Sequence, residues 1–447
     1  MPDVTGSGGW RKVRRARKRS QRSALGVAVA LLVGATLTAC GGGGGGVPTL
    51  NWYINPDNGG QATLAQKCTE AADGRYRIKT NLLPNDANGQ REQLVRRLAA
   101  DDDSIDLMSL DPVFMPEFAA AGFLRPFTDD EAQTLTEDVL DGPLEAARWD
   151  DKLYVAPFYA NTQLLWYRKS VAREAGIDPA RHDITWDQMI DAAEQTNTTV
   201  AITGARYEGY TVVINSLVAS AGGEILAHAD RGRDATPQLD SDAGRAAAEV
   251  LRRLGRSSAA APGMSNAIEN DARLAFEAES GGFMINWPFV YQAAKTGVED
   301  GSVDQSVVDD YAWARVPGVN EGEPGAPPLG GINIGIGAFT KHPDFAVDAV
   351  TCLTTTESQT EYMLAEGNPG SRSAVFDDPQ IREQFPMASL IRDSIDEATP
   401  RPLTPFYTDV SGAIQRTWHP PSSVNPNTTP EASDNLIVGV LNDEQLL

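Results

Sequence analysis

Hydrophobic and polar positions along the chain predict strands and helices in regular alternation. Residues 49–54, 76–83 and 105–110 are apolar or alternating runs of strand length. Between the first two, Leu64 and Cys68 recur at helical spacing, and a second helical pattern precedes the third run. A strand, helix, strand, helix, strand order is typical of a parallel sheet with helices on both faces. The fold class predicted is therefore α/β with parallel-rich sheets.

The same patterns predict further elements downstream. Strands are expected over 161–167, 283–288 and 330–339. Helices are expected over 90–100, 111–122, 185–195, 245–254 and 343–353, with a helix ending at 215–221 and a last helix from about 430. Small ligands on such sheets bind outside the carboxyl ends of the strands. Here those ends are the polar loops 55–60 and 85–89 and the pair Asp111-Pro112.

The N-terminal segment is typical of a secreted lipoprotein. A basic block over 11–22 precedes an uncharged apolar run over 24–38, which is too short to span a bilayer comfortably. Leu37-Thr38-Ala39-Cys40 is similar to a bacterial lipobox, and Gly41–Gly46 would form a flexible tether. Residues 1–39 are thus a predicted signal peptide, and 40–46 a lipidated cysteine with its tether. The alternative is an ordinary signal peptide with an incidental cysteine.

Length and charge narrow the function classes. The predicted mature chain keeps 408 residues, enough for two domains, and carries about 60 acidic against 30 basic side chains. Such an excess of negative charge disfavours nucleic acid and anionic lipid as partners. Of the three cysteines, Cys68 and Cys352 remain if Cys40 carries lipid. Outside the cytoplasm these two are expected to form a disulfide, unless both are buried free thiols.

Several short runs resemble one protein family. They are Asp106–Asp111 with Glu117-Phe118-Ala119, Asn161–Arg168, Leu274-Ala275-Phe276, Asn286-Trp287-Pro288, and Arg401-Pro402 before Thr404–Tyr407. In these runs, and over nearly all of the mature chain, the sequence resembles the extracellular solute-binding proteins (family 1) of sugar ABC importers. Within that family it is most similar to the actinobacterial trehalose-binding lipoproteins, whose two cysteines fall where Cys68 and Cys352 stand.

The resemblance implies a two-lobe fold that closes on a ligand like a hinge. It places lobe 1 at 47–158 with 329–370, and lobe 2 at 159–328 with 371–447. It implies a disaccharide ligand such as trehalose, with maltose or another glucoside as the alternative. It also implies a membrane permease as partner, a monomeric chain held outside the cell membrane, and no cofactor, metal or catalytic residue.

Candidate ligand-binding residues lie at predicted strand ends or on crossing segments. Each also has a simpler explanation: Asp111 as a helix cap, Asn161 as a turn residue, Glu269 as a solvated charge beside Asp271, and Trp287 as core. Arg401, between two prolines, could hold sugar hydroxyls or a carboxylate partner. The resemblance favours binding for all five. Weaker candidates are Asn55, Gln90 and Gly331, the last because a backbone amide there would be open to approach.

Two rival classes remain. A secreted glycoside hydrolase would use two carboxylates, and an acidic chain offers many such pairs. The four histidines have no metal-ligand spacing, and no G-x-S-x-G elbow occurs. The other rival is a structural surface protein, which would not need polar residues at the ends of its strands. No phosphate loop of the G-x-x-x-x-G-K-[ST] type occurs either, so the chain does not contain the ATPase motor.

Overall fold

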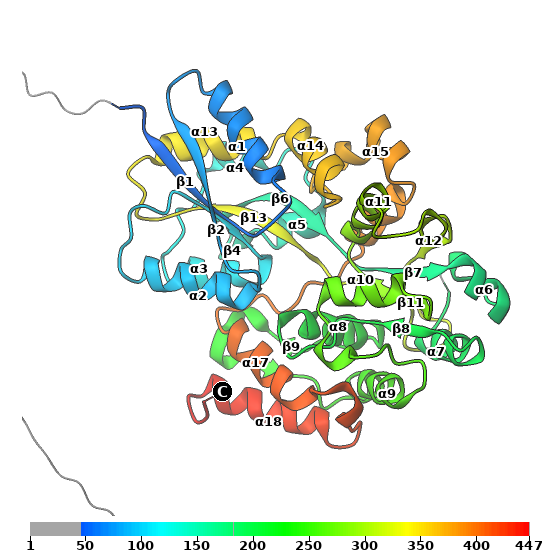
Figure 1. Ribbon diagram of the computed structural model, residues 1–447. Helices are drawn as coiled ribbons and strands as arrows, with labels where there is room; N and C mark the ends of the chain where they lie inside the picture. Colours follow the sequence, from blue (N-terminus) through cyan, green and yellow to red (C-terminus); the bar gives the residue numbers. More distant parts are fainter. Residues whose placement is uncertain (1–45, 182, 447) are drawn as a thin grey trace, which may run out of the picture. The chain divides into compact units, whose positions relative to one another are not determined.

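The computed structural model describes residues 46–181 and 183–446, and one compact unit begins at Val47 (Figure 1). The predicted signal peptide, the lipidation site Cys40 and the tether up to residue 45 lie outside the described residues. No helix within the described ranges is long and apolar enough to cross a membrane.

The first sheet gathers strands from the beginning and the late middle of the chain. Its order is β2-β1-β3-β13-β6. The bounds are β1 Thr49–Ile54, β2 Arg77–Leu82, β3 Leu107–Leu110, β6 Val155–Asn161 and β13 Gly330–Ile336. Strand β1 pairs in parallel with β2 and β3, as the sequence predicted. Strand β13 runs antiparallel to both β3 and β6.

The second sheet has the order β12-β7-β11-β8. The bounds are β7 Leu164–Arg168, β8 Thr199–Ala201, β11 Gly281–Asn286 and β12 Tyr311–Ala314. Strand β11 is parallel to β8 and antiparallel to β7, which is antiparallel to β12. Both sheets are therefore mixed. The α/β class is confirmed, but the parallel-rich character was wrong, because strands that enter each sheet after a crossing run against their neighbours. Two-strand ribbons complete the strands: β4 Arg148–Trp149 with β5 Lys152–Leu153, and β9 Leu226–Ala227 with β10 Thr236–Pro237.

The strand predicted over 161–167 is in fact the junction between the two sheets. Strand β6 ends at Asn161 and β7 begins at Leu164. The side chain of Asn161 accepts a hydrogen bond from the backbone N–H of Thr162 (3.1 Å), which favours a turn there. Thr162 and Gln163, both buried, thus connect one sheet to the other.

Helices cover the sheets, and several begin at a capping residue. Thr185 caps α7 through a capping box, at the start of the helix predicted over 185–195. Helix α2 begins three residues earlier than predicted, because Asp86 accepts a hydrogen bond from the backbone N–H of Gly89 and so caps it. The helices are α1 Gly60–Ala71, α2 Ala87–Leu98, α3 Met115–Ala120, α4 Asp129–Leu135, α5 Asp141–Glu145, α6 Lys169–Ala175, α7 Trp186–Gln195, α8 Glu208–Ser220, α9 Asp242–Arg256, α10 Glu269–Glu277, α11 Phe289–Asp300, α12 Gln305–Asp309, α13 Pro343–Leu353, α14 Thr356–Glu366, α15 Pro379–Gln384, α16 Ala388–Asp396, α17 Tyr407–Trp418 and α18 Thr429–Leu441. Short 3₁₀ helices lie at Pro112–Phe114, Pro179–Arg181, Ala229–Asp234, Met264–Asn266, Ser373–Asp377 and Pro421–Ser423.

Each sheet has its own hydrophobic core. One cluster surrounds the first sheet, and a second surrounds the second sheet with α17 and α18, the orange and red helices of Figure 1. A third cluster contains residues next to both sheets, among them Ala160 of β6, Trp166 of β7 and Ile391 of α16. Two cores joined by crossing segments make a two-lobe molecule.

A disulfide between Cys68 and Cys352 joins α1 to α13, and the two Cα atoms lie 5.9 Å apart. The predicted pairing is confirmed. The bridge connects positions separated by 284 residues, and both helices pack in the core of the first sheet.

Candidate functional site

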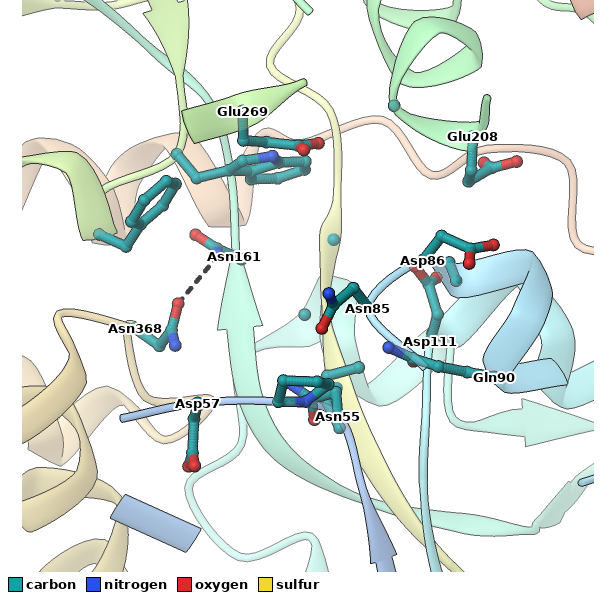
Figure 2. Close-up of a pocket in the computed structure, with 18 of the residues that line it drawn as sticks. Asn55, Asp57, Asn85, Asp86, Gln90, Asp111, Asn161, Glu208, Glu269 and Asn368 are labelled. Carbon is teal, nitrogen blue, oxygen red and sulfur yellow. Dashed lines mark hydrogen bonds between the residues drawn. The ribbon is translucent and has the colours of Figure 1, made fainter. Parts of the chain in front are cut away.

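A cavity of about 540 Å³, the central cavity, lies where strand ends of the first sheet face residues of the second sheet and its helices. Figure 2 shows side chains converging on it from several elements. All eight residues predicted from the sequence line it: Asn55, Gln90, Asp111, Asn161, Glu269, Trp287, Gly331 and Arg401. The structure therefore brings together residues that lie up to 346 positions apart in the chain.

The loop after β1 forms one wall of the cavity. The Asn55 side chain donates to the Tyr159 hydroxyl (3.4 Å), while its own Oδ1 is buried and has no partner in the described part of the chain. Asp57 accepts from the backbone N–H groups of Gly59 (3.0 Å) and Gln61 (2.7 Å), which fixes the start of α1. The loop thus holds one buried amide oxygen that has no hydrogen bond among the described residues.

Glu366, at the end of α14, holds the same loop from behind. Its carboxylate is buried and accepts from the backbone N–H of Asn58 (3.1 Å), the Asn58 side chain (3.0 Å) and the backbone N–H of Gly60 (2.9 Å). A buried carboxylate is tolerated when several donors satisfy it. Glu366 therefore positions the first wall. Glycine at position 60 lets it approach this closely, because a Cβ on Gly60 would lie 2.8 Å from the Glu366 side chain.

The loop after β2 adds a second group of polar residues. Asp86 caps α2, and Gln90 on the first turns of that helix donates to the carbonyl of Pro84 (2.9 Å). Gln90 thus braces the loop that carries Asn85 and Asp86, with its amide oxygen left over. Figure 2 shows Asn85, Asp86 and Gln90 grouped beside Asp111.

Arg401 connects a carboxylate at the first sheet with one from the second lobe. Its side chain is 1% exposed and donates to Asp111 (2.8 Å) and to Glu208 (2.7 Å). Burial alone would lower the pKa of Arg401, but the carboxylates of Asp111 and Glu208 outweigh it and raise that pKa. Glu208, the first residue of α8, also accepts from Ser411 (2.6 Å) and from Tyr407, and its burial raises its pKa.

Asp111 has both roles that the sequence allowed. Its Oδ1 accepts from the backbone N–H of Val113 (3.2 Å), as a helix cap would, and from Arg401. Its Oδ2 makes no hydrogen bond within the described part of the chain. Asp111 thus keeps one acceptor oxygen for the cavity, in an orientation that Arg401 fixes.

Trp287 supplies a flat aromatic surface. It follows β11 directly and is half-buried. A Cβ on Gly330 would lie 2.8 Å from the indole ring, so glycine there lets the ring approach the backbone of β13. Gly331 has φ +122°, and a Cβ there would lie 2.2 Å from the carbonyl oxygen of Tyr159. The predicted reason for Gly331 was close approach, and the group that approaches is a neighbouring strand.

Asn161 and Glu269 complete the opposite wall. The Asn161 side chain donates weakly to Asn368 (3.5 Å; Figure 2). Glu269 begins α10 and is partly exposed, and its carboxylate forms no ion pair with a described residue. Beside it the Tyr207 hydroxyl is buried, and no described residue gives it a hydrogen bond of good geometry. Burial, and after it the Glu269 carboxylate, raises the pKa of Tyr207.

About half of the polar lining was not predicted from the sequence. Asp57 and Asp86 lie on the loops 55–60 and 85–89, which follow predicted strands, so their positions carried a usable signal. Tyr159, Glu208, Glu366 and Asn368 gave none, because they come from an apolar strand, a helix start and the end of a helix. Only the packing of distant segments brings them to the cavity.

The chemistry of the lining suits a hydroxyl-rich molecule. The described lining residues include six carboxylates and one guanidinium, along with several amides and four aromatic rings. Carboxylates and amides accept and donate hydrogen bonds to hydroxyls, and an aromatic face packs against C–H groups. In the described ranges no group of three or more His, Cys, Asp or Glu residues could hold a metal ion.

Comparison with known families decides the membership of the chain. Residues 59–360 match the family described as bacterial extracellular solute-binding protein. The chain belongs to this family. That membership accounts for two cores connected by crossing segments with a polar cavity between them.

Individual members of the solute-binding family are similar at low identity. A probable ABC transporter-binding protein of Deinococcus radiodurans is 24% identical over 277 residues, which is 59% of this chain and 62% of that protein's length. The diacetylchitobiose binding protein DasA of Streptomyces coelicolor is 22% identical over 348 residues, covering 74% of this chain and 76% of DasA. Maltose-bound MalE3 of T. maritima superposes with a TM-score of 0.75 at 24% identity, covering 89% of this chain and all of MalE3. The structural match establishes a two-lobe, MalE-like fold.

Proposed function

We propose that this chain is the substrate-binding subunit of an ABC sugar importer and that it binds trehalose or a related disaccharide in the central cavity. The observation that carries the proposal is the lining itself: the indole of Trp287 on one wall, with carboxylate oxygens of Asp111 and Glu269 around it. An aromatic plate with several converging acceptors is what a neutral disaccharide requires.

The ligand class draws support from two further facts. The cavity volume of about 540 Å³ is in the range of small-molecule sites. The named ligands of two relatives, maltose for MalE3 and diacetylchitobiose for DasA, are disaccharides. The choice of trehalose as the ligand rests on the sequence runs Asn161–Arg168 and Asn286–Pro288, which resemble those of trehalose-binding lipoproteins. Maltose or another glucoside is the alternative.

Ligand binding is proposed to close two lobes, residues 47–158 with 329–370 and residues 159–328 with 371–447. Thr162 and Gln163 connect the two sheets, and a second connection joins Leu329 to Thr399 through a backbone hydrogen bond of 3.0 Å. A sugar that contacts both walls binds the closed form better and so shifts the population towards it. Small-angle scattering should record a smaller radius of gyration with sugar, and an unchanged radius at saturation would contradict closure.

The location proposed is the outer face of the cell membrane, with the chain held by lipid on Cys40 and delivering sugar to a membrane permease. The support is the order of basic block, apolar run and cysteine in the leader. In cells, Cys40→Ala should release the protein into the medium. Deletion of the gene should abolish uptake of labelled trehalose, and normal uptake would contradict the transport role.

Calorimetric titration of residues 47–447 against trehalose, maltose, sucrose and glucose tests the proposal. We expect trehalose to bind with a measurable heat. Trp287→Ala and Glu269→Gln should each lower the affinity for trehalose at least about tenfold. Trp149→Ala serves as the matched control, because Trp149 is also half-buried but lies on the β4–β5 ribbon, away from the cavity lining.

The other outcomes separate the alternatives. Binding of another sugar of the panel at the same residues would move the substrate and keep the transport function. No heat with any sugar, from protein shown to be folded by circular dichroism, would contradict sugar binding. Release of glucose from the disaccharides would favour the rival glycoside hydrolase.

A further inference from the structure

A second hollow, the edge hollow, lies beside the outer strand of the second sheet. It has a volume of about 370 Å³ and is bounded by β12, α11, α12 and the start of α6. Figure 1 shows α11 and α12 next to each other above β7. None of its lining residues lines the central cavity, so it is a separate depression of the surface.

Two aromatic rings form a corner in the edge hollow. Tyr291 and Trp313 are half-buried, with ring centroids 5.9 Å apart and planes at 74°. Fully buried Trp166 lies behind them, stacked on Tyr291 at 6.4 Å with an angle of 16°. The corner therefore rests on the packed core, and both of its rings keep an accessible part. Rigid rings of this kind can take the flat C–H face of a ligand at little entropic cost.

Polar groups around this corner are free to bond a ligand. The indole N–H of Trp313 and the hydroxyl of Tyr291 have no hydrogen-bond partner among the described residues, and neither atom is buried. Lys169, Lys295 and Glu299 likewise form no ion pair with a described residue. The Lys295 ammonium lies 5.7 Å from the centre of the Tyr291 ring. Among the described residues, the Asp309 carboxylate accepts only from the Gln305 side chain (2.8 Å). The hollow thus offers donors and acceptors side by side.

The charges of the edge hollow balance, unlike those of the body around it. Two lysines face two carboxylates, whereas the body carries about twice as many acidic as basic residues. A net-neutral site gives no electrostatic advantage to a strongly charged ligand. It suits a neutral molecule that has both an apolar face and many hydroxyls.

We propose that the edge hollow is a second saccharide site, which holds one pyranose ring of a neutral saccharide against Tyr291 and Trp313. In this site the ring's C–H face packs on Trp313, Lys169 and Lys295 donate to hydroxyl oxygens, and Glu299 and Asp309 accept from hydroxyls. The site is independent of the proposed substrate in the central cavity, so either proposal can fail without the other.

The test is an NMR titration of residues 47–447 carrying Trp287→Ala, which removes the aromatic plate of the central cavity. The indole N–H signal of Trp313 is assigned by its absence in Trp313→Phe. Glucose, maltose and cellobiose are the neutral probes, and glucosamine and glucuronate are the charged ones. We expect the neutral sugars to shift the Trp313 signal with a millimolar Kd, and Tyr291→Ala or Lys295→Ala to weaken that binding about tenfold.

Controls make the result decisive. The indole signal of Trp149, identified by Trp149→Phe, should not move, because Trp149 lies outside the edge hollow. Lys152→Ala, on the same ribbon, is the matched control for Lys295→Ala and should leave the shift unchanged. The proposal would be overturned if no sugar moved the Trp313 signal, or if Lys295→Ala left the sugar-induced shift unchanged. A stronger response to a charged sugar than to the neutral ones would also overturn it.

Discussion

Single side chains fix the geometry of the central cavity through buried charge. Arg401 and Glu208 are 1% and 5% exposed in their side chains and bond each other at 2.7 Å. Removing one partner of such a pair leaves a charge buried and uncompensated, which costs more than the pair itself contributes. The cavity wall that Asp111 provides therefore depends on a carboxylate that was not evident from the sequence.

Glu208→Gln should destabilise the protein by about 3 kcal/mol, because Arg401 then keeps only Asp111 as a charged partner. Urea unfolding measures the change. Glu249→Gln is the matched control: Glu249 pairs with Arg252 on the surface, with side chains 47% and 35% exposed, and its loss should cost at most about 1 kcal/mol. Equal losses of unfolding free energy in the two variants would show that an uncompensated buried charge is not the cause of the Glu208→Gln effect.

Glycine at position 331 is a second requirement at the residue scale. Gly331→Ala should cost about 2–4 kcal/mol, because φ is +122° and the new Cβ would lie 2.2 Å from the Tyr159 carbonyl oxygen. Gly263→Ala is the comparison, since Gly263 has a positive φ in the left-handed helical region (+74°) and no described atom within 4 Å of the new Cβ. We expect Gly263→Ala to cost only about 1 kcal/mol in urea unfolding. A similar cost at both positions would remove the steric explanation.

At the scale of elements, local patterns predicted fewer than half of the helices and could not predict the crossings. Helix α13 has the predicted bounds Pro343–Leu353, and α7 begins where the Thr185 cap placed it. Capping residues and apolar spacing depend on a few neighbouring residues, so they can be predicted from the sequence. The break at Thr162 and the reversed direction of β13 depend on pairing between segments more than 150 residues apart. The same limit explains the site: Asp111 and Trp287 end strands, whereas Glu208 and Glu366 reach the cavity only through packing.

The loop between α2 and β3 offers a pH test of one element. Asp102 accepts from Ser104 (Oγ 2.7 Å, backbone N–H 3.0 Å) and from Arg97 (2.7 Å), and the Ser104 hydroxyl is the main cause that lowers the pKa of Asp102 to about 2, from an ordinary 3.8. A depressed pKa in the fold means that Asp102 stabilises the protein above 3.8 and that this stabilisation is lost as pH falls towards 2.

The stability difference between the wild type and Asp102→Asn should therefore shrink as pH is lowered through this window. Urea unfolding at a series of pH values from neutral to the acid limit of folding measures it. Asp101→Asn is the control for removal of a carboxylate from the same loop, since the Asp101 carboxylate has no hydrogen bond or ion pair among the described residues. A difference for Asp102→Asn that is constant or grows on acidification would contradict the sign.

At the scale of the whole molecule, the disulfide and the cavity occupy different ends of one helix. Helix α1 begins at Gly60, beside the cavity loop that Glu366 holds, and carries Cys68 two turns later, bonded to Cys352 on α13. Three hydrogen bonds to Glu366 fix the loop locally, whereas the bridge restricts a chain segment of 284 residues in the unfolded state. Stability and binding should therefore respond differently to loss of the bridge.

Replacing both cysteines by alanine should lower the free energy of unfolding by up to about 5 kcal/mol, because the unfolded chain regains the freedom that the bridge removes. Alanine is chosen because Cys68 is fully buried and a hydroxyl there would have to be satisfied. Sugar affinity, measured by calorimetry below the unfolding transition, should change less than about twofold, since Glu366 still holds the loop. Glu366→Gln is the converse variant, which weakens the acceptor of three loop donors and should lower affinity more than stability. If the double alanine variant lost affinity as strongly as Glu366→Gln, the bridge and not Glu366 would be what positions the first wall of the cavity.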